Sequence, residues 1–170
     1  FEMDYSNMFD EIENSARERH IPVILDDSKD ELLALVTKIK PKRILEIGTA
    51  IGYSGSLMLD IAKDCVLDTV ELLEDRREEA LSNFKKFGVI DRVNSFLGDA
   101  RELLPQIIKG NIYDLVFIDG PKSKYTEYLN MVLGNIKKGG YVFCDNVLFR
   151  GMVASGNKPP HKYRTIVVSL

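Results

Sequence analysis

Two apolar stretches of the sequence end in oxygen-bearing side chains. Asp119 directly follows residues 115–118, and the adjacent Asp145 and Asn146 follow residues 141–144. The apolar, β-prone composition of both stretches predicts strands buried in a sheet. Paired strand ends lie about 5 Å apart, or about 10 Å with one strand between them, so the three side chains can converge. Two carboxylates and a carboxamide, without His or Cys, favour a hard cation such as Mg²⁺ over zinc. The alternative is that Asp145 and Asn146 only cap the following turn.

A lysine three residues after Asp119 adds a candidate base to these oxygen ligands. Beside a divalent cation the charged form of Lys122 is disfavoured, so its amine can accept a proton near neutral pH. Lys124 is the alternative base. Either lysine is also compatible with an ordinary solvated side chain.

The elements that must position these side chains follow from the hydrophobic periodicity, which alternates between helical and strand patterns. Helices are predicted over residues 4–19, 28–40, 54–62, 76–87, 100–109 and 124–136, and strands over 43–47, 66–70, 93–97, 113–118 and 140–144. Ser28 is the predicted N-cap of the second helix, with Glu31 as its capping-box partner. The alternation predicts an α/β fold with right-handed crossovers and a mostly parallel sheet covered by helices on both faces.

The turn after the first predicted strand contains two glycines. Gly48 and Gly52 bracket a tight strand-to-helix connection that lets backbone approach a ligand and leaves helix N–H groups available. A dinucleotide fingerprint has another glycine where this chain has Ala50. A packed turn without a ligand is the alternative.

The ends of the second and third strands carry further candidate ligand residues. Glu71, about 20 residues beyond the glycine turn, is well placed to accept hydrogen bonds from ribose hydroxyls. Gly98 permits a close approach, and Asp99 can accept from an adenine amino group. Glu71 alone is equally compatible with a solvated surface position, but the three strand ends together favour a nucleoside-bearing cofactor.

Chain length, net charge, cysteine context and the length of apolar runs indicate which broad class of protein this is. The 170 residues suit one domain with a real core, and the net charge of −3 argues against a wholly basic nucleic-acid-binding protein. Cys65 and Cys144 lie in apolar contexts without metal-ligand spacing, which favours buried free thiols in a reducing compartment. No apolar run is long enough to span a bilayer, and the first residues are unlike a signal peptide. We therefore expect a cytoplasmic protein without a membrane partner.

Five motifs carry a resemblance to a known family. The stretches RILEIGTAIGYS, VELLEDRREEALSNF, FLGDARELLP, YDLVFIDGPKSKY and KKGGYVFCDNVLFRGMV resemble the metal-dependent S-adenosylmethionine O-methyltransferases, the class that holds the catechol and caffeoyl-CoA methyltransferases. Within that class, ERHIPVI, ILEIGTAIGYS and DNVLFRGMVA are most similar to the bacterial tRNA 5-hydroxyuridine methyltransferases. The resemblance covers residues 19–153 and implies a Rossmann-like methyltransferase fold.

The resemblance also implies roles for individual residues. Contacts to S-adenosylmethionine are expected from Ile24, Glu46, Gly48, Ser54, Glu71, Asp99, Ala100 and Asp119. In that assignment Ile24 touches the methionine part, Glu46, Gly48 and Ser54 line its amino-acid end, Glu71 holds the ribose, and Asp99 and Ala100 flank the adenine. The metal ligands are expected to be Asp119, Asp145 and Asn146, with Lys122 as the catalytic base. Pro121 departs from the family, in which an aromatic residue or alanine commonly precedes the lysine.

One methyltransferase domain is expected over residues 1–170. It comprises N-terminal helices (1–40), a cofactor-binding and catalytic core (41–153) and an incomplete C-terminal segment (154–170). The family continues into a helix and an antiparallel hairpin that this chain lacks, so we expect a fragment of a longer domain. The resemblance also suggests a homodimer.

The sequence is compatible with two classes of acceptor substrate. Mg²⁺ chelated by two neighbouring oxygens lowers the pKa of a hydroxyl, and both catechols and 5-hydroxyuridine offer such a pair. Residues after Asp145 include basic side chains and no acidic ones, which favours phosphate contacts and hence tRNA. The basic side chains are Arg150, Lys158, His161, Lys162 and Arg164, with Arg17, Arg19 and His20 as further candidates. A solvated loop and a coenzyme A thioester are alternatives for the same segment, and a nucleotide-binding module without catalysis is a third function class.

Overall fold

A single mixed sheet forms the centre of the molecule in the computed structural model, which describes residues 4–120, 122–146 and 165–169. The strand order is β3-β2-β1-β4-β5-β6. The strands are β1 (Arg43–Ile47), β2 (Val66–Glu71), β3 (Val93–Leu97), β4 (Tyr113–Gly120), β5 (Ile136–Asn146) and β6 (Thr165–Ser169). Strands β1 to β5 pair in parallel, and β6 pairs antiparallel with β5. The predicted five-stranded parallel sheet is confirmed, and β6 extends it by one strand.

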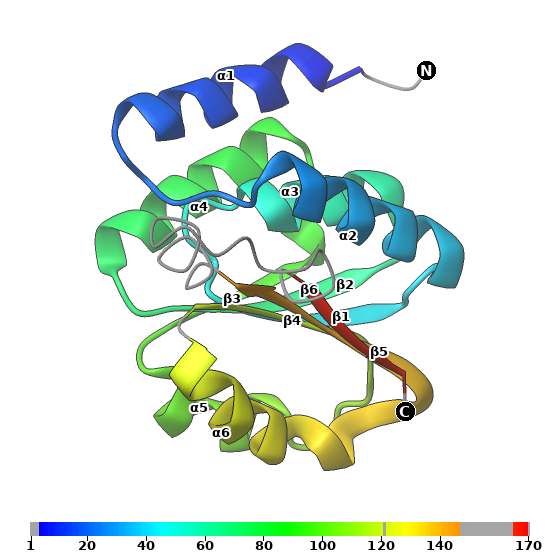
Figure 1. The fold of residues 1–170 in the computed structure, drawn as a ribbon. Helices are drawn as coiled ribbons and strands as arrows, with labels where there is room; N and C mark the ends of the chain where they lie inside the picture. Colours follow the sequence, from blue (N-terminus) through cyan, green and yellow to red (C-terminus); the bar gives the residue numbers. More distant parts are fainter. Residues whose placement is uncertain (1–3, 121, 147–164, 170) are drawn as a thin grey trace, which may run out of the picture.

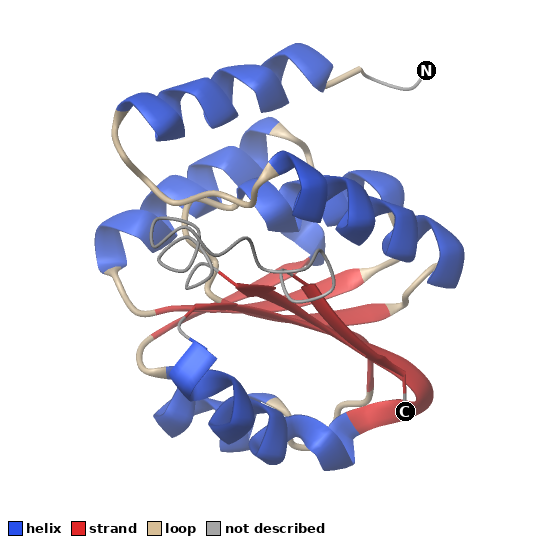
Figure 2. Ribbon diagram, in the orientation of Figure 1, coloured by secondary structure: helices blue, strands red, loops and turns tan. Residues whose placement is uncertain are grey.

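Helices cover both faces of the sheet, as predicted (Figure 1). The helices are α1 (Ser6–Glu18), α2 (Asp26–Ile39), α3 (Tyr53–Ile61), α4 (Glu74–Lys86), α5 (Ala100–Ile107) and α6 (Lys122–Val132). Helices α1 to α4 lie on one face, and α5 and α6 lie on the other, so the layering is helix–sheet–helix (Figure 2). In the part of the chain that the structure describes, no helix has the length and apolar character needed to cross a membrane.

The strand residues alternate between two hydrophobic cores. Ile44 and Leu115 belong to the core under α1 to α4, whereas their chain neighbours Leu45 and Val116 belong to the core against α5 and α6. All four are fully buried. This period of two follows from the pleat of a strand, and burial on both faces explains the continuous apolar runs in the sequence.

Several predicted boundaries differ from the structure, among them the end of the helix predicted over residues 124–136, and two of the differences have an identifiable physical reason. Helix α2 begins at Asp26, not after an N-cap at Ser28, which is 2% exposed within the first turn. Asp26 and Asp27 place negative charge at the positive end of the helix dipole, which favours the earlier start. Strand β5 begins at Ile136 and not at residue 140, because its register with β4 shifts where Gly139 takes a left-handed φ of 81°.

The parallel register brings the predicted chemistry to one edge of the sheet. Asp119 is the register partner of Asp145, and Glu71 is the partner of Leu97 at the end of β3. Strands that run in parallel end on the same side, so these strand ends share an edge with Gly48 after β1. The side chains of Lys122 and Asn146, together with Pro121 and the basic residues between 150 and 164, lie outside the described part of the structure.

Candidate functional site

The glycine turn after β1 is shaped by close contacts that exclude a side chain. Gly48 has a φ of 102°, and a Cβ added there would lie 3.0 Å from the backbone oxygen of Asp119 and 3.3 Å from its Cβ. A Cβ added at Gly52 would lie 3.2 Å from three atoms of Ala80 in α4. Gly48 therefore lets β1 approach the end of β4, and Gly52 lets α3 start against α4.

Ala50 occupies the middle of this turn in a left-handed conformation, with a φ of 48°. This is the position at which a dinucleotide fingerprint has glycine, a residue that adopts a left-handed conformation without the steric cost of a Cβ. A left-handed alanine costs about 1–2 kcal/mol. The backbone N–H of Ala50 donates to Glu71 Oε1 at 2.7 Å, which offsets part of that cost.

Glu71 connects the glycine turn to the end of β2. Its side chain is buried at 9% exposure, and its second oxygen, Oε2, accepts from the backbone N–H of Leu73 at 3.0 Å. Each carboxylate oxygen can accept more than one hydrogen bond. Glu71 is thus held in one orientation by two backbone donors and retains acceptor capacity toward a ligand.

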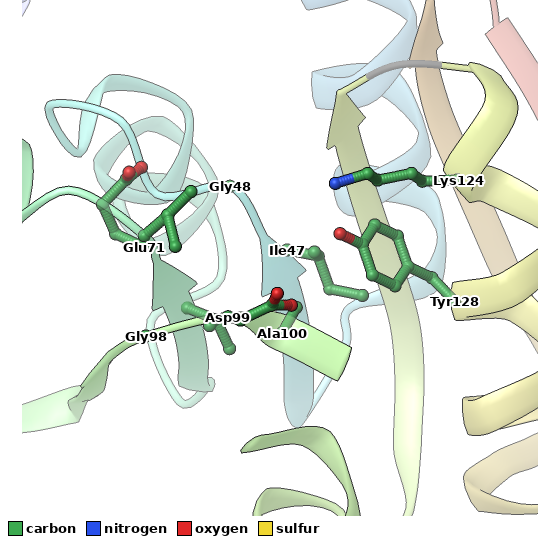
Figure 3. A pocket seen from close by; sticks show the side chains of 10 residues that line it. Ile47, Gly48, Glu71, Gly98, Asp99, Ala100, Lys124 and Tyr128 are labelled. Atoms are coloured by element: carbon green, nitrogen blue, oxygen red, sulfur yellow. The ribbon is translucent and has the colours of Figure 1, made fainter. Parts of the chain in front are cut away.

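A cavity of about 130 Å³ lies at the ends of β1, β2 and β3 (Figure 3). It is lined by Ile47, Gly48, Val70, Glu71, Leu72, Gly98, Asp99, Ala100, Lys124 and Tyr128. Four of the predicted cofactor residues therefore surround one space: Gly48, Glu71, Asp99 and Ala100. Leu72 is 65% exposed at its rim, and Ala100 is buried at 7% exposure.

Asp99 is fixed at the start of α5. Its side chain caps the helix by accepting from the backbone N–H of Arg101 at 2.9 Å, and it pairs with the Arg101 guanidinium at 2.8 Å. These hydrogen bonds from Arg101 lower the pKa of Asp99 to about 2. Gly98, with a φ of 146°, donates its N–H to the backbone oxygen of Glu71 at 2.9 Å and so ties β3 to β2 beneath the cavity.

The wall opposite these carboxylates comes from α6. Lys124 and Tyr128 are one helical turn apart, and in Figure 3 both reach toward Ile47 and Gly48 from the helix. The sequence reasoning considered Lys124 only as an alternative base and did not single out Tyr128. The i, i+4 spacing of the two residues in the helix after β4 was the available signal.

Four other predicted cofactor residues do not line this cavity: Ile24, Glu46, Ser54 and Asp119. Glu46 is fully buried and accepts from Ser54 Oγ and from Thr69 Oγ1, each at 2.7 Å. Burial raises the pKa of Glu46 to about 7, against the opposing effect of these two hydrogen bonds. Ile24 is 4% exposed and belongs to the core under α1 to α4. Roles for Ile24, Glu46 and Ser54 at the amino-acid end of the cofactor stay predictions.

The predicted metal ligands meet at the neighbouring ends of β4 and β5. Asp119 is partly exposed and Asp145 is 7% exposed, and the two are direct register partners. The Tyr125 hydroxyl in α6 donates to the backbone oxygen of Asp145 and so anchors the end of β5. Among the described residues no cluster of three His, Cys, Asp or Glu side chains is present, so a site here depends on two carboxylates and the Asn146 amide. Such a donor set fits a hard divalent cation.

The comparisons with known proteins agree with this architecture. A family model described as O-methyltransferase matches residues 4–169. A catechol O-methyltransferase from Niastella koreensis is 32% identical over 149 residues, which cover 85% of this chain and 67% of the relative. A caffeoyl-CoA O-methyltransferase from Stellaria longipes is 31% identical over 130 residues, which cover 73% of this chain and 54% of the relative. The chain therefore spans between about half and two thirds of the length of these relatives.

A solved structure extends the likeness to three dimensions. The O-methyltransferase TomG from Streptomyces achromogenes, in complex with S-adenosylmethionine, superimposes with a TM-score of 0.76 at 28% identity. The match covers 94% of this chain and 73% of TomG. The family match over nearly the whole chain and the shared fold lead to one conclusion. This chain belongs to the O-methyltransferase family.

Proposed function

We propose that the chain transfers a methyl group from S-adenosylmethionine to a hydroxyl oxygen. The observation that carries the proposal is the cavity at the ends of β1, β2 and β3, which joins Gly48, Glu71 and Asp99 beside the paired strand ends of Asp119 and Asp145. The relative TomG was solved with S-adenosylmethionine, which supports the same cofactor here.

The nucleoside part of the cofactor is assigned to this cavity. Glu71 accepts hydrogen bonds from the ribose hydroxyls with the acceptor capacity that its two backbone donors leave. Gly48 and Gly98 let the backbone approach the ribose, and Asp99 and Ala100 flank the adenine. At the amino-acid end we assign Ile24 and Ser54 as contacts. Glu46, being fully buried, acts there by orienting the Ser54 hydroxyl.

The chemistry is assigned to the ends of β4 and β5. Asp119, Asp145 and Asn146 would hold a divalent cation, Mg²⁺ by preference, which when bound supplies acidification of an acceptor hydroxyl. Lys122 takes up the hydroxyl proton. The acceptor oxygen then forms a bond to the methyl carbon as the carbon–sulfur bond breaks in line, and the neutral thioether leaves. Holding both reactants in attack geometry provides much of the acceleration.

Two acceptor classes fit a site that holds two neighbouring oxygens. The motifs shared with tRNA 5-hydroxyuridine methyltransferases and the basic residues after Asp145 favour 5-hydroxyuridine at the tRNA wobble position, with 5-methoxyuridine as the product. The relatives named for catechol and caffeoyl-CoA favour a small phenolic acceptor to the same degree. A homodimer is part of the proposal by family resemblance alone, and a cytoplasmic location is part of it by the bulk properties of the sequence.

The test is a methyl-transfer assay with methyl-labelled S-adenosylmethionine. Hydroxyuridine-bearing tRNA, caffeoyl-CoA and a catechol are offered separately, each with Mg²⁺ and with a chelator. The proposal expects label in one acceptor class, lost with the chelator and lost in Asp145→Ala. The matched control Asp91→Ala changes an exposed aspartate before β3 and is expected to keep full activity. Transfer that survives the chelator would refute the metal assignment, and no transfer to any acceptor would refute the activity.

A further inference from the structure

The cavity at the ends of β1, β2 and β3 has hydrogen-bond acceptors on one side and donors on the other. Glu71 and Asp99 supply the acceptors from the strand ends, whereas the Lys124 ammonium and the Tyr128 hydroxyl reach in from α6 (Figure 3). The family assignment explains the acceptor side. It leaves the donor side on α6 without a role.

The acceptor side is already engaged by the protein. The two oxygens of Glu71 accept from the backbone N–H groups of Ala50 and Leu73, and Asp99 is bound by Arg101. The donor side differs. Within residues 4–120 and 122–146, neither the Lys124 ammonium nor the Tyr128 hydroxyl has a hydrogen-bond or ion-pair partner. Lys124 interacts with the Asp99 carboxylate only at longer range.

The charges around the cavity restrict what Lys124 can bind. An anionic group, such as a phosphate, would have to lie beside the carboxylates of both Glu71 and Asp99, and that repulsion disfavours it. A neutral ring that carries acceptor atoms has no such conflict. The ring nitrogens of a purine base are acceptors of this kind. Tyr128 is 8% exposed, so its ring shields this wall from solvent and strengthens a hydrogen bond from Lys124.

We propose that Lys124 is a specificity-determining residue, whose ammonium donates a hydrogen bond to a ring nitrogen of the cofactor's base. Tyr128 packs one turn further along α6 and limits the positions that the base can take. This proposal rests on the proposed function, because it assumes that the nucleoside of S-adenosylmethionine occupies the cavity. It also separates Lys124 from Lys122, since it gives Lys124 a binding role and not a proton-transfer role.

The experiment combines one substitution with changes to single atoms of the ligand. Calorimetric titration measures the Kd of S-adenosylhomocysteine and of its 1-deaza, 3-deaza and 7-deaza analogues, each of which replaces one ring nitrogen by C–H. The proteins are the unaltered chain, Lys124→Met, and the control Lys109→Met, which changes an exposed lysine after α5. Thermal melting of each variant checks that it is folded.

We expect Lys124→Met to bind S-adenosylhomocysteine about tenfold or more weakly, the usual effect of losing one hydrogen bond from a charged group. One deaza analogue should bind the unaltered chain with a similar loss. That analogue should lose nothing further in Lys124→Met, because the same hydrogen bond is already absent. Lys109→Met should bind all four ligands as the unaltered chain does.

Two results would overturn this proposal without touching the proposed function: an unchanged Kd in Lys124→Met, and a loss of the same factor for all four ligands. An unchanged Kd together with a loss of methyl transfer in Lys124→Met would assign Lys124 to proton transfer. If the unaltered chain does not bind S-adenosylhomocysteine at all, the cofactor assignment fails and this proposal fails with it.

Discussion

Replacing Gly48 by alanine tests whether the glycine turn sets the position of Asp119. The added Cβ would lie 3.0 Å from the backbone oxygen of Asp119 and 3.3 Å from its Cβ, and both atoms are at the base of the proposed metal ligand. Relief of these contacts requires the end of β4 to move away from β1. The substitution should therefore affect both folding stability and the metal site.

The magnitude follows from two separate costs. Alanine in the left-handed region costs about 1–2 kcal/mol, and overpacking against backbone that cannot move freely costs about 1–3 kcal/mol. Gly110 provides a matched control, because its φ of 77° is also left-handed but an added Cβ meets nothing within 4 Å. Gly110→Ala should show the first cost only, so the two variants should differ by about 1–3 kcal/mol in free energy of unfolding.

Urea denaturation gives the free energy of unfolding, and calorimetric titration with Mn²⁺ gives the affinity of the metal site. Gly48→Ala should lower the Mn²⁺ affinity, whereas Gly110→Ala should leave it unchanged. Equal destabilisation of the two variants, together with equal Mn²⁺ affinities, would refute the argument that Gly48 positions Asp119.

Three further predictions concern buried ionisable groups. Asp68 is 1% exposed and accepts hydrogen bonds from two nitrogens of Arg43. Asp68→Ala should lower the free energy of unfolding by about 3–5 kcal/mol, because the guanidinium loses its partner. A decrease below about 1 kcal/mol in urea denaturation would contradict this. Burial raises the pKa of Glu46 from 4.5 to about 7. In the unfolded chain the Glu46 carboxyl ionises near pH 4.5, whereas in the folded chain it keeps its proton up to about pH 7. The free energy of unfolding should therefore fall by about 3 kcal/mol as the pH rises from 4.5 to 7. Subtracting the pH profile of Glu46→Gln from that of the unaltered chain should isolate this fall, and parallel profiles would speak against it. Burial also raises the pKa of Cys65 to about 12 and that of Cys144 to about 11. A thiol reagent should accordingly label both only when urea unfolds the chain, and rapid labelling of the native protein would disprove their burial.

The fold was predictable because its main signals are local. The central strands β1 and β4 are buried on both faces and appear as apolar runs, as in residues 115–118. Each of β1 to β4 is followed by a helix, and a parallel strand–helix–strand connection has a fixed handedness. The polar residues at the strand ends then converge because parallel strands end on the same side. Asp119 and Asp145 were expected to meet on this ground and are register partners.

Features that depend on tertiary packing were not predictable from the sequence. The capping-box pattern at Ser28 and Glu31 was locally plausible, but Ser28 is buried inside the first turn of α2. The full burial of Glu46 depends on hydroxyl donors from β2 and α3. The contribution of Tyr128 depends on which face of α6 turns toward β1. No local pattern separates Ser28 and Glu46 from ordinary helix or strand residues. The i, i+4 spacing of Lys124 and Tyr128 does not say which face of α6 turns toward β1.

The most direct test of the account is calorimetric titration with S-adenosylhomocysteine of the unaltered chain, Glu71→Gln and Glu78→Gln. Glu71 lines the cavity, whereas Glu78 is exposed on α4 and serves as the control. We expect binding to one site in the unaltered chain and in Glu78→Gln. Binding should be about 10- to 100-fold weaker in Glu71→Gln, because the ribose loses hydrogen bonds to a charged acceptor. Equal affinities in all three proteins, or no binding to the unaltered chain, would contradict the claim that the ends of β1, β2 and β3 hold the cofactor.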